Sequence, residues 1–167
     1  DLILLAARPG IGKTSVALNI ASNASKSGKN VAVFNLEMSR TQLVQRMLSS
    51  EGMIDLKKIK TADLTDDEWD RLASASKTLS AAPIYIDDTA NITVAEIKAP
   101  CRRLPNLGLV IIDYLQLMNA SGMSFIISTL LEESSNIFLY LVESSFLVSI
   151  INVLVRILPS LDFQCRR

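Results

Sequence analysis

The stretch that decides the fold is Ala6-Ala7-Arg8-Pro9-Gly10-Ile11-Gly12-Lys13-Thr14, which follows the apolar run Leu2-Ile3-Leu4-Leu5 and precedes a helical pattern. Read from Ala7, it has Ala in the first Gly position of a phosphate-binding loop, then four variable residues and Gly-Lys-Thr. Glycines let backbone N–H groups approach a phosphate closely, and the amino end of the following helix attracts the same anion. The sequence therefore predicts a nucleotide site.

Each residue of this loop has an expected role. Lys13 should reach the β- and γ-phosphates as a catalytic residue, and the Thr14 hydroxyl should bind Mg²⁺. The expected cofactors are ATP and Mg²⁺. The residues expected to bind the nucleotide are Ala7, Arg8, Pro9, Gly10, Ile11, Gly12, Lys13 and Thr14.

Composition limits the other kinds of site. The 167 residues carry 17 Lys and Arg, 17 Asp and Glu, no His and two Cys. A zinc site and a disulfide framework are therefore not expected, and the balanced charge gives no field that would indicate a nucleic-acid partner. Because a domain rarely begins on its central strand, we expect a domain truncated at the amino end.

Apolar runs alternate with helical patterns along residues 1–118. Strands are predicted at 31–36, 83–88 and 109–113, and capping boxes at Ser39, Thr65 and Thr93 predict the starts of three helices. Continuous apolar strands are typical of a parallel α/β sheet with helices on both faces. In the helix over 13–27, the apolar face is expected to be Val16, Ala17, Ile20 and Ala24.

Carboxylates follow three of these strands, where ligands bind in such sheets. Asp113 is the best candidate for the Mg²⁺ side, and Glu37 is the best general base to activate water. Asp87-Asp88 is a rival Mg²⁺ site, and helix capping or plain solvation remains the alternative for each of these carboxylates.

Several motifs together resemble the ATPase domain of DnaB-type replicative DNA helicases, over about residues 1–118. They are the phosphate loop, Phe34-Asn35-Leu36-Glu37-Met38-Ser39, Gln42-Leu43-Val44-Gln45-Arg46-Met47-Leu48, Ala82-Pro83-Ile84-Tyr85-Ile86-Asp87-Asp88-Thr89 and Ile111-Ile112-Asp113-Tyr114-Leu115-Gln116-Leu117-Met118. The resemblance implies a RecA-like fold and, in the intact family, a ring hexamer that uses ATP to move along single-stranded DNA and separate strands.

The same resemblance assigns the roles within the site. It implies that Glu37 is the catalytic base, that Thr14 and Asp113 hold the metal, and that Asp87-Asp88 has a supporting role. It also implies single-stranded DNA, primase and other replisome proteins as partners, and a cytoplasmic location in a bacterial or organellar replisome.

The chain departs from the family pattern in three places. Asn35 stands where the family usually has Ser, and Pro100 should interrupt the helix that begins after Thr93, at a cost of ~3 kcal/mol. After Met118 the family's next strand, its Ser-Gln sensor, its DNA-binding loops and its arginine finger are not recognised. We therefore divide the chain into a partial ATPase domain, 1–118, and a divergent apolar, Ser-rich tail, 119–167.

The tail allows several interpretations. Ile137 to Leu158 is long enough to span a bilayer, although Glu143 and Arg156 argue against a membrane segment. A reading-frame change after Met118 would also explain the loss of resemblance. In the RecA-like order, a strand must lie between the phosphate-loop strand and the strand ending at Asp113, and residues 137–142 are the best substitute for it.

Two other functions fit parts of the sequence. One is a RecA-like ATPase of another branch, of the recombinase or clock type. The other is a nucleotide-binding module without catalysis. The run that follows Ile112, from Asp113 to Met118, favours the helicase family over another RecA-like branch, and the binding module stays open.

Overall fold

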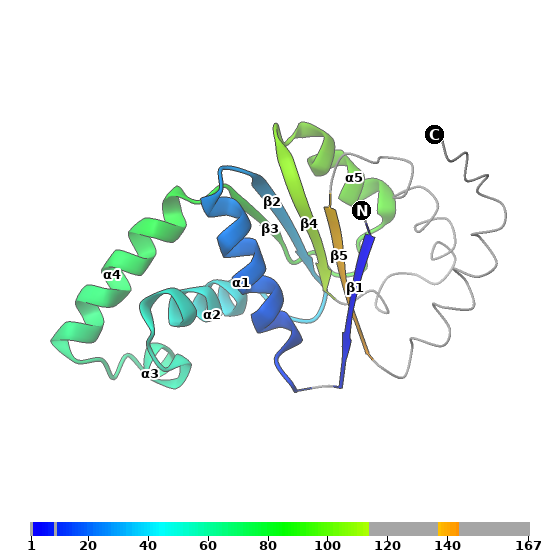
Figure 1. Ribbon diagram of the computed structural model, residues 1–167. Helices are drawn as coiled ribbons and strands as arrows, with labels where there is room; N and C mark the ends of the chain where they lie inside the picture. The colour runs from blue at the N-terminus through cyan, green and yellow to red at the C-terminus, as the bar shows by residue number, and fades with distance from the viewer. Residues whose placement is uncertain (1, 9, 114–136, 144–167) are drawn as a thin grey trace, which may run out of the picture.

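Five parallel strands form a single sheet in the computed structural model, which describes residues 2–8, 10–113 and 137–143 (Figure 1). The strands are β1 (Leu2–Ala7), β2 (Asn30–Asn35), β3 (Ile84–Asp87), β4 (Leu107–Asp113) and β5 (Ile137–Glu143). Their order across the sheet is β1-β5-β4-β2-β3. The predicted strands and the parallel α/β architecture are thus confirmed. Pro9 and the run Tyr114 to Met118 lie outside the described residues.

Helices connect the strands as α1 (Lys13–Lys26), α2 (Arg40–Gly52), α3 (Leu56–Thr61), α4 (Asp66–Ala81) and α5 (Val94–Arg103). The connections from β1 to β2 and from β2 to β3 move in one direction across the sheet, and the connection to β4 reverses it. Right-handed crossovers therefore put α5 on the opposite face from α1. Helix α1 packs on the sheet, α2 packs on α1, and α3 and α4 extend outward from α2 (Figure 1).

The three predicted capping boxes are present. Ser39, Thr65 and Thr93 each accept a hydrogen bond from the backbone N–H three residues on, and the Gln or Glu at that position bonds back to the cap. These bonds satisfy N–H groups that a helix start leaves unpaired. Local sequence thus sets where α2, α4 and α5 begin.

The buried face of α1 differs from the predicted one. Ala17 is buried as expected, but Val16 and Ile20 are 50% and 41% exposed. The buried side chains of α1 are instead mostly small, with Leu18 as the large one, and α1 contacts β2 and β4. The buried residues of α1 are Ala17, Leu18, Ala21, Ser22 and Ser25.

Pro100 does not interrupt α5, contrary to the expectation. The helix continues to Arg103, and the N–H of Leu104 closes its last turn on the Pro100 carbonyl at 3.1 Å. The capping box at Thr93 and the burial of Ile97, which is 1% exposed, hold the helix before the missing N–H, and the Leu104 bond holds it after. Leu104 is then extended before Pro105, as a residue before proline prefers, and the helix ends there.

Strand β5 fills the slot predicted between β1 and β4. Ile3 pairs with Leu139, and Leu139 also pairs with Ile111 on the other side. Part of the 119–167 segment therefore completes the sheet with residues 1–113. The division of the chain into two domains stays a prediction, and residues 144–158 of the segment considered for a membrane span lie outside the described residues.

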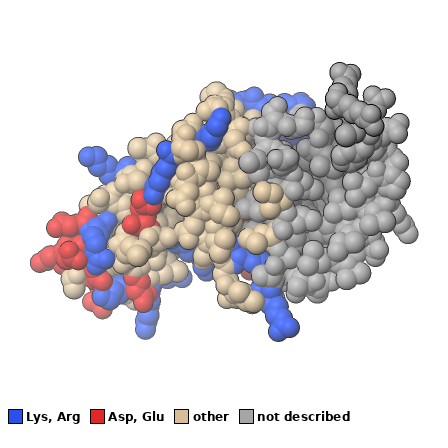
Figure 2. Space-filling model, in the orientation of Figure 1, with Lys and Arg blue, Asp and Glu red and all other residues tan. Residues whose placement is uncertain are grey.

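Charged side chains gather over α3 and the start of α4, where acidic and basic groups are intermixed (Figure 2). Lys57 and Lys60 are exposed, and Lys58 forms a 2.7 Å ion pair with Glu68.

In the described part of the chain, no helix has the length and apolar character needed to cross a membrane.

Candidate nucleotide-binding site

The predicted site residues lie at the carboxyl edge of the sheet. Asn35 at the end of β2 pairs in register with Asp113 at the end of β4. Asp113 also pairs with Leu141 of β5, and the last residue of β1, Ala7, pairs with Glu143. The phosphate loop that follows β1 therefore opens at the same edge as Asp113, as ligand sites in parallel sheets do.

Thr14 and Asp113 are in direct contact. The Thr14 hydroxyl Oγ1 donates a 2.7 Å hydrogen bond to Asp113 Oδ2 across 99 residues of sequence. A hydroxyl and a carboxylate are oxygen ligands of the kind that Mg²⁺ prefers. The two residues predicted to hold the metal are thus brought together.

Asp113 is buried, with 2% of its surface exposed. Burial raises the pKa of this carboxyl, because a low-dielectric environment disfavours the charged form. The hydrogen bond from Thr14 and the positive charge of Lys13 oppose this rise in pKa, whereas the negative charge of Glu37 adds to it. Lys13 and Glu37 therefore lie close enough to Asp113 for their charges to affect its pKa.

Asn35 joins Asp113 to the segment that carries Glu37. Its Nδ2 donates to Asp113 Oδ2 at 2.8 Å, and its Oδ1 accepts from the backbone N–H groups of Glu37 and Met38. Sequence reasoning noted Asn35 only as a departure from a pattern. Asn side chains commonly bond to the backbone two residues on, so the sequence could have indicated the turn to Glu37 but not the bond to Asp113.

The loop fits a phosphate group. Gly10 and Gly12 have φ angles of 78° and 100°, a region that favours glycine, and a Cβ at either position would meet nothing within 4 Å. Helix α1 begins without a side-chain cap, whereas α2, α3, α4 and α5 each have one. Its first turn can therefore offer backbone N–H groups to an anion.

Asp87 and Asp88 lie away from this pair, at the end of the edge strand β3. Burial would raise the pKa of Asp87, but hydrogen bonds from Thr89 and Tyr85 hold the pKa below its usual value. Asp88 accepts a 2.8 Å bond from the Arg40 N–H at the start of α2. These contacts fit the supporting role implied for Asp87-Asp88 and favour Asp113 as the metal-side carboxylate.

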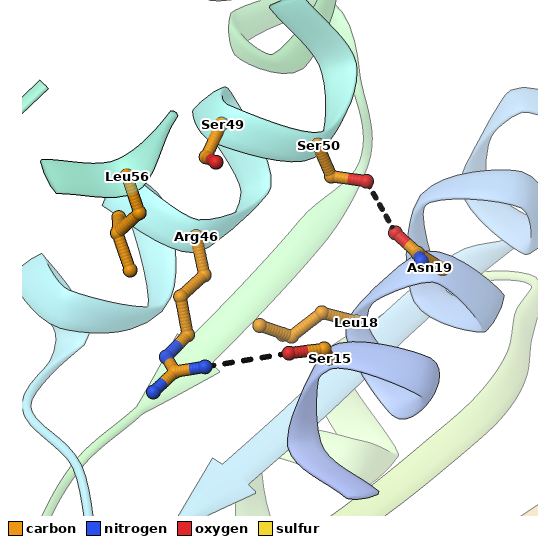
Figure 3. Close-up of a pocket in the computed structure, with 7 residues that line it drawn as sticks. All are labelled: Ser15, Leu18, Asn19, Arg46, Ser49, Ser50 and Leu56. Atoms are coloured by element: carbon orange, nitrogen blue, oxygen red, sulfur yellow. Dashed lines mark hydrogen bonds between the residues drawn. The ribbon is translucent and has the colours of Figure 1, made fainter. Parts of the chain in front are cut away.

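A pocket of about 240 Å³ opens between α1 and α2, with Ser15 in the first turn of α1 and Leu56 of α3 in its lining (Figure 3). Arg46 donates a 3.3 Å bond to the hydroxyl of Ser15, the residue after Thr14, and Ser50 donates a 2.7 Å bond to Asn19 one turn further along. The paired contacts, each four residues apart on its helix, fix α2 against the first turns of α1. The sequence did not predict these contacts, because no sequence pattern links residues that lie on two separate helices.

Comparison with known proteins identifies a family model that matches residues 1–137, described as "DnaB-like helicase C terminal domain". The match continues beyond Met118, where the recognised motifs end. The replicative DNA helicase DnaB of Geobacillus stearothermophilus is 54% identical over 128 residues, and DnaC of Bacillus subtilis is 52% identical over the same length. Each alignment covers 74% of this chain but only 28% of the relative.

Solved structures agree with the sequence comparison. One solved structure, described as an ATPase domain, matches with a TM-score of 0.77 at 30% identity, covering 86% of this chain and 57% of that one. A DnaB-like replicative helicase, described with its primase interactions, matches with the same TM-score and identity over 38% of its length. The RecA-like fold implied by the motifs is confirmed.

Proposed function

Because this chain belongs to the DnaB-like helicase C terminal domain family, we propose that it is the ATP-binding part of a replicative DNA helicase. The observation that carries the proposal is the 2.7 Å contact between Thr14 and Asp113 at the end of the phosphate loop. The loop residues 7–14 would surround the phosphates of ATP.

Four side chains have separate proposed roles in binding and hydrolysing ATP. The Lys13 ammonium would compensate the charge of the β- and γ-phosphates, and Thr14 and Asp113 would hold Mg²⁺. When bound, Mg²⁺ neutralises charge that develops on the phosphate oxygens. The Glu37 carboxylate, exposed at the end of β2, would orient a water molecule and accept its proton.

The wider activity rests on the family rather than on this chain alone. The relatives are named replicative DNA helicases. We therefore propose that the chain acts along single-stranded DNA, that it assembles as a ring hexamer, and that its location is cytoplasmic, in a bacterial or organellar replisome. Primase is a proposed partner, because one structural neighbour is described with primase.

Replacing Lys13 tests the binding site. Lys13→Ala should weaken ATP–Mg²⁺ binding by about 10- to 100-fold in titration calorimetry, since it removes a charged hydrogen-bond donor. Lys26→Ala removes the same charge at the far end of α1, where Lys26 pairs with Glu51, and should leave the affinity unchanged. Unchanged affinity in Lys13→Ala would contradict the site.

Replacing the carboxylates tests the chemistry. Glu37→Gln should retain nucleotide binding and lower single-turnover ATP hydrolysis by at least about 100-fold, because it removes the base. Asp113→Asn should make ATP binding and hydrolysis depend less on Mg²⁺, and Asp88→Asn should not. The reverse pattern would assign the metal to Asp87-Asp88.

The chain by itself is not expected to unwind DNA. An arginine finger is worth about 10³–10⁵ in rate in related nucleotide hydrolysis, and no such residue is recognised after Met118. Comparing ATP binding with ATP turnover stimulated by single-stranded DNA separates the helicase interpretation from a binding module. Robust ATP-dependent unwinding of a forked duplex by the 167-residue chain would refute this expectation.

A further inference from the structure

Asn35 is a buried polar side chain whose hydrogen bonds all lead to the candidate site. It is the last residue of β2 and is 1% exposed. Its amide nitrogen donates to Asp113 Oδ2 at 2.8 Å, and its amide oxygen accepts from the N–H of Glu37 at 3.0 Å and of Met38 at 2.6 Å. One amide group therefore bonds both to the end of β4 and to the segment that follows β2.

The bond to Asp113 orients that carboxylate. Oδ2 accepts from both Thr14 and Asn35. Two donors on one oxygen restrict the rotation of the carboxylate plane. Asn35 thus acts on the same oxygen as the hydroxyl expected to bind Mg²⁺.

The bonds from the other end of the amide hold the backbone that leads to Glu37. Asn35 Oδ1 bonds two and three residues ahead, which closes a side-chain turn. The N–H of Leu36 also donates to the Asp113 carbonyl at 2.7 Å. The segment from Asn35 to Met38 is therefore fastened to the end of β4.

We propose that Asn35 is a positioning residue that sets the place of Glu37 relative to the Thr14–Asp113 pair. The inference rests on the proposed function, because the benefit of a fixed Glu37 is the alignment of a water molecule with the γ-phosphate. Serine, which the family pattern has here, offers one hydroxyl oxygen where Asn offers a separate donor and acceptor. This chain therefore uses a longer, two-ended connection.

Hydrogen exchange of the free protein tests the positioning directly. In Asn35→Leu, which keeps the side-chain size but removes both polar ends, the amides of Glu37 and Met38 should exchange at least about fivefold faster. Asn35→Ala also removes both polar ends and should speed exchange at both amides, so it provides the test if the leucine variant does not fold. Asn30→Leu, which removes an Asn bonded to the Pro105 carbonyl at the other end of β2, is the matched control and should leave both amides protected. Wild-type protection in a folded Asn35 variant would overturn the inference.

Kinetics separates positioning from binding. Asn35→Ala should lower the single-turnover rate by about 10- to 100-fold while the ATP affinity stays within about twofold, because a small misplacement of a reacting group costs rate. Loss of affinity and rate together, or an unchanged rate, would refute a positioning role. Turnover in Glu37→Gln equal to that of the natural chain would refute the proposed function, and the exchange experiment would still decide whether Asn35 holds the segment.

Discussion

Ser22 lies on the buried face of α1, and its hydroxyl has no hydrogen-bond partner among the described residues. A buried hydroxyl without a partner is destabilising, and Ala is also the better helix former. Ser22→Ala should therefore raise the free energy of unfolding by about 1 kcal/mol in urea denaturation. Ser25→Ala is the control, because the Ser25 hydroxyl donates to the Ser22 carbonyl at 2.8 Å, and it should give no such gain.

Glu68 makes stability depend on pH at acid values. Its carboxylate accepts bonds from Lys58 and from Thr65, and these bonds lower its pKa from 4.5 to about 2. A depressed pKa in the folded state stabilises the protein above the unfolded value, and the contribution is lost as the pH falls from 4.5 toward about 2.

The stability lost in Glu68→Gln should therefore be largest above pH 4.5 and should shrink toward pH 2, measured by thermal unfolding across this range. A difference between Glu68→Gln and the natural protein that stays constant down to pH 2 would contradict the assignment.

At the scale of single residues, the sequence identified the groups of the site but not their connections. Lys13, Thr14, Glu37 and Asp113 carry the chemistry, and their positions after strands already predict that they converge. The role of Asn35 depends on Asp113, 78 residues away, so no local pattern contains it.

At the scale of elements, α5 contains a proline that can be removed. Pro100 has no N–H for the Glu96 carbonyl, and a proline in a helix interior costs about 3 kcal/mol. Pro100→Ala should therefore stabilise the protein by roughly 1–3 kcal/mol in chemical denaturation, less than the full cost where the helix has already adapted. Pro105→Ala, beyond the end of the helix, should change the stability far less. No gain from Pro100→Ala would mean that α5 adapts fully to the proline.

Helix starts were the most predictable elements, since a capping box is made of residues within one turn. The buried face of α1 was not, because Val16 and Ile20 fit the helical period as well as Leu18 and Ala21 do. Where α1 packs on the sheet, small residues fit best. Which face of α1 is buried therefore depends on the neighbouring strands, not on the sequence of α1 alone.

At the scale of the whole molecule, β5 lies inside the sheet, with β1 on one side and β4 on the other. Proline is excluded from central strands because it cannot donate to the ladder. Leu139→Pro should therefore abolish cooperative unfolding or lower the midpoint in urea strongly. Leu139→Ala keeps the backbone N–H and should retain a cooperative transition. Unchanged stability in Leu139→Pro would contradict the position of residues 137–143 inside the sheet.

The pairing of β1 has a consequence for biosynthesis. Within the described residues β1 pairs only with β5. Leu2 can therefore form its strand pairing only after Phe138, far along the chain, has been synthesised. Such long-range pairing is slow compared with local helix formation. On a translating ribosome, β2, β3 and β4 can assemble first, and the strand that leads into the phosphate loop joins last. A nascent chain that stops before residue 137 would contain every residue of the phosphate loop. It would still lack β5, the strand with which β1 pairs.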